Sequence, residues 1–141
     1  MRQRLVQIAL LVVASVVPAL AHHPFAAEYD WKKPISITGT VTKFDWENPH
    51  SSITIKGKDD TGTESEWMVE LAGPGQLTRL GWNSHQLKAG DRVSVDGWLA
   101  KSGKKQLSAK SVTVPDGRQL AAGSSFFDEV KSPATKRQAK L

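Results

Sequence analysis

The sequence predicts a small all-β domain built from five strands and one short helix. Apolar and polar residues alternate with the two-residue period of a strand in five stretches, and Gly, Pro, Asn and Asp cluster between these stretches. Residues 76–80 instead space two leucines three residues apart and end at Gly81, which is typical of a short helix. Three strands, a short helix and two further strands is the order of the OB-fold, a small Greek-key barrel. An open sandwich of similar strands is the alternative.

The first strand is expected over Ile35–Trp46. Its two isoleucines and Val41 share one face, whereas Phe44 starts the opposite phase, so a β-bulge or sharp coil is expected near Lys43. Gly39 lies in the same strand. A long first strand with such a glycine is what closing a small barrel requires.

The remaining strands are separated by polar turns. They are expected over His50–Lys56, Glu64–Ala72, Arg92–Ala100 and Gln106–Val114. Trp67 lies on the inward phase of its strand and is expected in the core. Gly97 predicts a bend or a close backbone approach in the fourth strand.

The first 21 residues are expected to be a secretory signal peptide. Two arginines precede an apolar run from Leu5 to Val17, and Ala19-Leu20-Ala21 supplies the A-x-A cleavage pattern. The apolar run is shorter than the roughly 20 residues that span a bilayer. Cleavage after Ala21 predicts a mature periplasmic or secreted protein that is not an integral membrane protein. It would have an irregular lead-in over 22–34, a barrel over 35–125 and a flexible basic tail over 126–141.

The excess of positive charge lies at the two ends of the chain. The formal net charge is +5, but residues 22–130 hold 13 basic and 14 acidic residues, a net of −1. The barrel is therefore electrically balanced, and no nucleic-acid partner is expected. The chain has no cysteine, so its stability must come from packing rather than disulfides.

Several short motifs are spread along the chain, each weak by itself: His22-His23-x-Phe25, Thr38-Gly39-x-Val41, Trp46-x-Asn48-Pro49-His50, Trp67-x-x-Glu70-Leu71, Arg79-x-Gly81-Trp82, Leu87-Lys88-x-Gly90-Asp91-x-Val93-x-Val95-x-Gly97 and Val114-Pro115-Asp116-Gly117-Arg118. Together they resemble DUF6152, a family of exported bacterial proteins of unknown function, over nearly all of residues 22–125. The resemblance implies export and a compact β domain, and it brings no activity, substrate or cofactor. The family often has serine at the position of Pro24, which has no N–H and cannot act as a deprotonated amide ligand.

Three histidines form the candidate metal site. As the first residue of the mature chain, His22 would offer an α-amine and an imidazole that close a chelate ring on one metal ion. His23 and His50 would join it if the lead-in folds back across the mouth of the barrel, beside the turn at Pro49. Nitrogen ligands favour copper, with zinc second. Alternatively, His22 and His23 are only a polar end and His50 is a turn residue whose ring bonds a carbonyl.

The second hypothesis is a metal-free interaction module. Trp46, Trp82 and Trp98 lie near strand or helix ends, where a barrel face could present them to a periplasmic protein, a peptide or a glycan. Closing the ends of the barrel core is their other possible role. His85 lies in a polar loop and is expected to be exposed.

Catalysis is not expected from these residues. Glu66 and Glu70 share one face of a strand about 13 Å apart, too far for a glycosidase pair. No Ser/His/Asp set is recognisable, and Gly73-Pro74-Gly75 lacks the lysine of a phosphate-binding loop. A copper-dependent oxidative enzyme is the third hypothesis, after metal binding and the interaction module.

Overall fold

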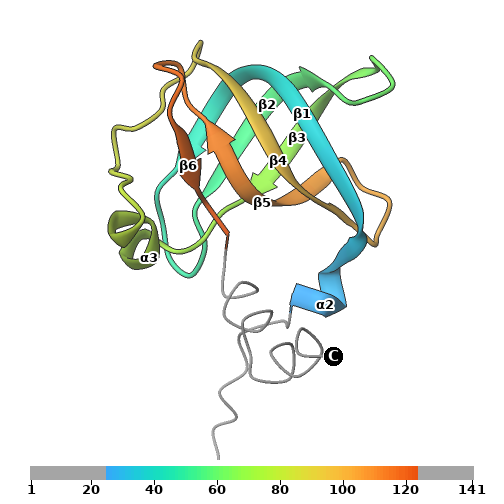
Figure 1. Ribbon diagram of the computed structural model, residues 1–141, viewed down its shortest axis with the longest axis horizontal. Coiled ribbons are helices and arrows are strands. Elements are labelled where there is room, and N and C mark those ends of the chain that lie inside the picture. The colour runs from blue at the N-terminus through green and yellow to red at the C-terminus, as the bar shows by residue number, and fades with distance from the viewer. Residues whose placement is uncertain (1–24, 124–141) are drawn as a thin grey trace, which may run out of the picture.

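The computed structural model describes residues 25–123, which form an all-β domain with little helix (Figure 1). In chain order, its elements are α2 (Phe25–Glu28), β1 (Tyr29–Asp45), β2 (Ser52–Lys58), β3 (Glu64–Glu70), α3 (Pro74–Arg79), β4 (Arg92–Ala100), β5 (Gln106–Thr113) and β6 (Gln119–Ala121). The predicted signal peptide, His22, His23 and most of the predicted tail lie outside the described residues.

The strands form one sheet that closes on itself. Their order is β3-β2-β1-β4-β5-β6, and a further pairing joins β3 to β5, so the first five strands make a ring. The closing pairing is parallel and sets Met68 beside Gln106 and Glu70 beside Ser108, whereas the other pairings are antiparallel. The end of β3 therefore lies beside the start of β5.

Strand β1 is long enough to pair on both sides. Its register against β2 skips one residue between Val41 and Lys43, which confirms the predicted bulge. The skipped residue is Thr42, whose hydroxyl donates to the Thr54 carbonyl at 3.2 Å. The extra residue explains why the apolar phase changes at Phe44.

The expectation of an irregular segment before residue 35 was wrong for residues 25–34. Helix α2 and the first part of β1 lie there instead. Tyr29 pairs with Ala100 of β4 and is only 1% exposed, so one buried aromatic ties this segment to the ring. The sequence pattern did not predict this part of β1 because the residues after Tyr29 are mostly charged, and because a proline such as Pro34 usually marks the end of a strand.

The strand count also differs from the prediction, because the described residues contain six strands rather than five. The additional strand, β6, pairs with the last residues of β5. It has only three residues, of which one is half-buried. So short a segment shows no alternating pattern long enough to predict a strand. The expected helix is present as α3, with Leu77 buried and Gly81 at a φ of +92° just beyond its end.

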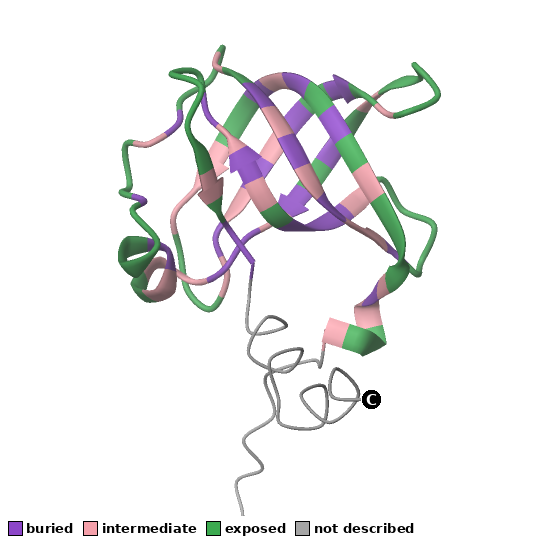
Figure 2. Cartoon of the chain, viewed as in Figure 1, coloured by how far each residue is buried: buried purple, intermediate pink, exposed green. Residues whose placement is uncertain are grey.

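The core fills the inside of the ring, and buried positions alternate with exposed ones along the strands (Figure 2). Trp67 is 2% exposed, as predicted. A Cβ on Gly97 would overlap the carbonyl oxygen of Ser108 in β5, which confirms the predicted close approach. Within residues 25–123, the helices are all too short or too polar to span a membrane.

Candidate functional site

His50 is held beside the end of β3 by backbone hydrogen bonds of its neighbour. Ser51 donates its N–H to the Ala72 carbonyl at 3.1 Å and accepts the N–H of Leu71 at 2.9 Å. The loop between β1 and β2 is therefore bonded to the chain just after Glu70. This places the His50 ring next to the Glu70 carboxylate.

Four side chains from four parts of the chain form a hydrogen-bonded network, here called the His50 network. His50 Nδ1 lies 2.9 Å from Glu70 Oε1, and Tyr29 donates its hydroxyl to Glu70 Oε2 at 2.9 Å. Gln106 Nε2 donates to the Tyr29 hydroxyl at 2.8 Å. The four residues come from the loop before β2, the end of β3, the start of β1 and the start of β5.

The donors and acceptors in the His50 network fix the proton on the imidazole. A glutamate carboxylate only accepts hydrogen bonds, so the proton between His50 and Glu70 is on Nδ1 of His50. Burial, together with the negative charge of Glu70, raises the pKa of Tyr29 well above its usual value. Tyr29 therefore stays protonated and keeps donating.

Exposure is graded along the His50 network. The Tyr29 residue is 1% exposed, the Glu70 side chain 18% and the His50 side chain 33%. The network thus runs from the buried end of the ring toward the surface, and the imidazole is its outermost group.

The described residues do not by themselves form the predicted metal site. Within residues 25–123, no three His, Cys, Asp or Glu side chains are grouped so that they could hold one ion. Of the three predicted ligands, His50 is described, whereas His22 and His23 lie outside. Any further ligand from these two must come from the chain that leads into α2.

That chain enters α2 close to the His50 network. The Phe25 ring lies 5.4 Å from the Tyr29 ring and 5.5 Å from the Trp98 ring, measured between centroids. Phe25 is thus separated from His50 by one tyrosine side chain and one carboxylate. It follows His22 by only three residues.

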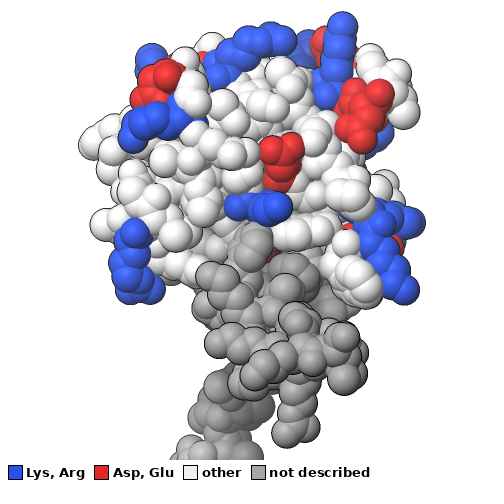
Figure 3. All heavy atoms as spheres, in the orientation of Figure 1, with Lys and Arg blue, Asp and Glu red and all other residues white. Residues whose placement is uncertain are grey.

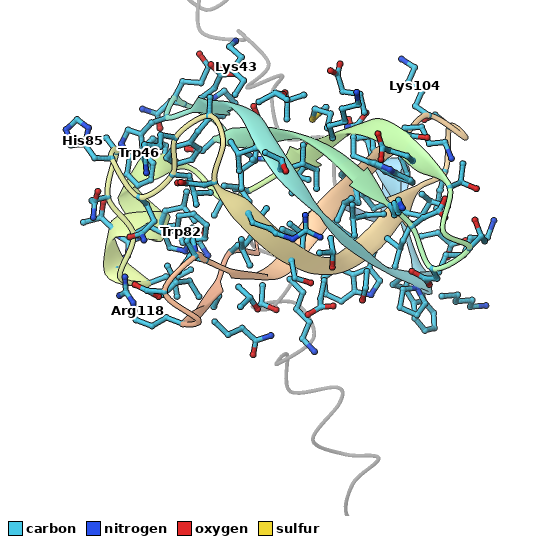
Figure 4. All side chains as sticks on the ribbon, turned by 90° about the horizontal axis from the view of Figure 1, so that it is seen from above. Lys43, Trp46, Trp82, His85, Lys104 and Arg118 are labelled. Carbon is cyan, nitrogen blue, oxygen red and sulfur yellow. The ribbon has the colours of Figure 1, made fainter. Side chains whose placement is uncertain are left out.

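The three tryptophans proposed for ligand binding are engaged in packing. Trp82 is 2% exposed and donates its Nε1 hydrogen to the Ala121 carbonyl at 2.8 Å. Trp46 is half-buried and packs edge-on against Phe44 at 5.9 Å. Both lie at the end of the molecule that carries His85 (Figure 4). Trp98 is half-buried beneath Phe25, so these side chains stabilise the ring and its ends.

Two other predicted residues lie away from the His50 network. His85 is exposed in the loop after α3, and its side chain points outward (Figure 4). Glu66 is exposed opposite Lys56 of β2. On the face shown in Figure 3, acidic and basic side chains are scattered rather than gathered by sign.

The sequence patterns did not point to Tyr29 or Gln106, and they indicated no role for Glu70 at a metal site. Glu70 stood in a quoted motif and on the outward phase, but periodicity does not tell which outward acid meets a histidine. The exposed tryptophan, Trp31, was also overlooked: it is 57% exposed, and the Lys32 ammonium lies 5.2 Å from its ring centre.

The chain belongs to the family of unknown function DUF6152, whose model matches residues 9–109. The match covers the histidines of the candidate site, Glu70 and Gln106. It ends before the motif that begins at Val114. No curated protein and no solved structure shows significant similarity to the chain.

Proposed function

We propose that this DUF6152 chain is a small exported protein that binds copper through its processed amino terminus. Cleavage after Ala21 would free the amine of His22, and the ion would be bound by that amine with His22, His23 and His50. The protein would act in the periplasm or outside the cell, by binding rather than by turnover. Zinc is the second candidate ion.

The observation that supports the proposal best is the hydrogen bond between His50 Nδ1 and Glu70. Histidines that bind metals commonly donate their second ring N–H to a carboxylate, which fixes the tautomer and raises the basicity of the ligating nitrogen. Here the carboxylate is itself held by the buried Tyr29. A surface histidine in a turn does not need such a half-buried carboxylate behind it.

The expected ligands favour copper over other divalent ions. An amine and imidazoles are borderline nitrogen donors, and copper(II) binds most tightly among the first-row divalent ions. The amine and any imidazole that carries a proton would release that proton on binding, because only the unprotonated nitrogen is a ligand. Pro24 has no amide hydrogen, so the third backbone nitrogen is excluded as a ligand.

We also propose that the ring of β1 to β5 is an OB-fold barrel to which β6 is added. The pairing order and the parallel contact of β3 with β5 support this assignment. Helix α3 lies between β3 and β4, as the OB-fold requires.

The test is copper(II) titration of protein whose mass proves that it begins at His22, beside the same protein acetylated at its amino terminus. Acetylation converts the amine of His22 to an amide and keeps every side chain, so copper affinity should fall steeply. A His50→Gln variant should bind more weakly than the unacetylated protein and should show fewer nitrogen ligands by electron paramagnetic resonance. His85→Gln is the matched control, because His85 is exposed and lies away from the His50 network.

Two outcomes would contradict the proposal. Equal affinity with and without the acetyl group would show that the terminus is not the site. Absence of binding in every form would instead direct attention to a metal-free interaction, for which Trp31 offers an exposed aromatic ring.

A further inference from the structure

We propose that the cavity between helix α2 and the β4–β5 turn binds a small zwitterion, a ligand with both an ammonium and a carboxylate group, such as a free amino acid or a short peptide. This inference goes beyond the proposed copper site and does not depend on it.

The cavity lies where α2 faces the turn that joins β4 to β5 (Figure 1). Its volume is about 500 Å³, within the range of roughly 300–1,000 Å³ that is typical of small-molecule sites. Two alanines line it together with five polar or charged residues: Glu28, Lys101, Ser102, Lys104 and Gln106. Such a lining suits a small polar ligand better than an apolar one.

Both signs of charge line the cavity without neutralising each other. Glu28 contributes a carboxylate from α2, whereas Lys101 and Lys104 contribute ammonium groups from the turn. Within residues 25–123, none of these three side chains takes part in an ion pair, whereas Lys105 of the same turn is paired with Asp59 at 3.7 Å. The cavity thus offers a negative and a positive group to a ligand.

The Glu28 carboxylate is close enough to the ring to act on a buried group. Glu28 is half-buried. Burial and the charge of Glu70 are the larger causes of the raised pKa of Tyr29, and the charge of Glu28 adds to them. A partly buried charge is screened less by water and salt than an exposed one, so Glu28 should attract a ligand ammonium more strongly than a surface carboxylate would.

Two neutral polar groups extend the match. Gln106 donates an amide hydrogen to the Tyr29 hydroxyl at 2.8 Å, so its amide is oriented before a ligand arrives, and its oxygen is a further acceptor for an ammonium. The Ser102 hydroxyl accepts the backbone N–H of Lys104 at 3.3 Å and keeps its own hydrogen to donate to a carboxylate.

Lys101 supplies the main donor for a carboxylate. Its backbone N–H donates to the Glu28 carbonyl at 2.8 Å, and its ammonium donates to the Ala26 carbonyl, so the side chain is held along α2. An ammonium has three hydrogens, and two remain for a ligand after this contact. Lys104 points away from the body of the protein and adds a more distant positive charge (Figure 4).

The two signs of charge select against ligands with a single charge. An anion bound by Lys101 would also face the carboxylate of Glu28, and a cation bound by Glu28 would face the ammonium of Lys101. Each like-charge contact weakens binding, whereas a zwitterion satisfies both groups at once.

The test measures the binding of L-alanine and dialanine by calorimetry and NMR, in protein without copper. At least one probe should bind and shift the amide signals of Ala27 and Ala100, the alanines of the cavity. The tighter probe shows whether the ligand is an amino acid or a peptide. N-acetyl-dialanine lacks the ammonium and dialaninamide lacks the carboxylate, so each should bind about tenfold more weakly than dialanine.

The variants are matched to the probes. Glu28→Gln should weaken dialanine binding about tenfold but should not weaken N-acetyl-dialanine binding, because the group that Glu28 would bind is absent there. Lys101→Met should weaken dialanine but not dialaninamide, and Lys101→Arg should retain binding because arginine keeps the charge and can donate to Ala26. Glu66→Gln and Lys110→Met are the controls, because they remove the same charges at exposed positions outside the cavity. Thermal unfolding checks that each variant is folded.

Three outcomes would overturn the inference. The first is that neither L-alanine nor dialanine binds the parent protein. The second is that N-acetyl-dialanine binds as tightly as dialanine, because the cavity would then be a simple anion site. The third is that Glu28→Gln weakens dialanine and N-acetyl-dialanine equally, because Glu28 would then act only through the structure of α2. None of these outcomes bears on copper binding, which acetylation of His22 tests separately.

Discussion

Replacing Glu70 with glutamine should move the proton on His50 from Nδ1 to Nε2. The glutamine has one accepting oxygen and one donating amide group, whereas Glu70 accepts from both Tyr29 and His50. Tyr29 is buried and needs an acceptor, so the amide oxygen should turn toward its hydroxyl. The amide NH₂ then faces His50 Nδ1, which must become an acceptor.

The proton of the His50 ring is then on Nε2, the nitrogen that the proposed copper ion would use. Outer-shell partners of a metal ligand are worth about 10- to 100-fold in affinity, so Glu70→Gln should lower copper affinity by that factor. Losing one charge-assisted hydrogen bond should also cost about 1–2 kcal/mol of folding free energy. Because folded domains are typically stable by about 5–15 kcal/mol, this loss leaves the variant folded, and unfolding would not explain the lower affinity.

Nitrogen chemical shifts of the His50 ring report the tautomer without copper, and titration reports the affinity. Glu66→Gln is the matched control, because it removes the same charge from the same strand at an exposed position. A parent protein whose His50 carries its proton on Nε2 would refute the reasoning. So would a Glu70→Gln variant with unchanged copper affinity.

Three further predictions concern the ring itself. Gly97→Ala should destabilise it by about 1–3 kcal/mol in urea unfolding, because the new methyl overlaps a β5 carbonyl, whereas Gly75→Ala meets no atom within 4 Å and should be neutral or stabilising. The raised pKa of Tyr29 predicts stability that is full below pH 10 and lost at higher pH; Tyr29→Phe should flatten this alkaline loss in thermal melts. Hydrogen bonds from Thr61 and Thr63 lower the pKa of Asp59, so stability should fall as pH drops below about 4, and less so in Asp59→Asn.

Local patterns predicted most of the ring, because its strands alternate strictly and its turns are rich in glycine and proline. The bulge after Val41 and the close approach at Gly97 were predicted because each breaks a pattern in a specific way. Helix α2 and the start of β1 were not, since a single buried tyrosine among charged residues carries no period.

His50 of the candidate site was predicted from the sequence, whereas its contacts were not, because they join distant parts of the chain. His50 is a polar residue in a turn, and its chemistry depends on Glu70, 20 residues later, and through it on Tyr29. The contacts of Tyr29 with Glu70 and Gln106 depend on ring closure, because Glu70 lies on β3 and Gln106 on β5, the two strands whose pairing closes the ring. No local pattern encodes that juxtaposition.

Copper should stabilise the folded chain only to the extent that His50 takes part in binding. An ion that binds only the folded chain stabilises it by about 2.7 kcal/mol at a hundred times its Kd. The amine of His22 and the ring of His23, however, stay close together in the unfolded chain and can still chelate copper there. The stabilisation measured by urea unfolding should therefore report the share contributed by His50, and it should vanish in His50→Gln although that variant still binds copper. A variant stabilised as much as the parent would show that the terminus binds without the ring.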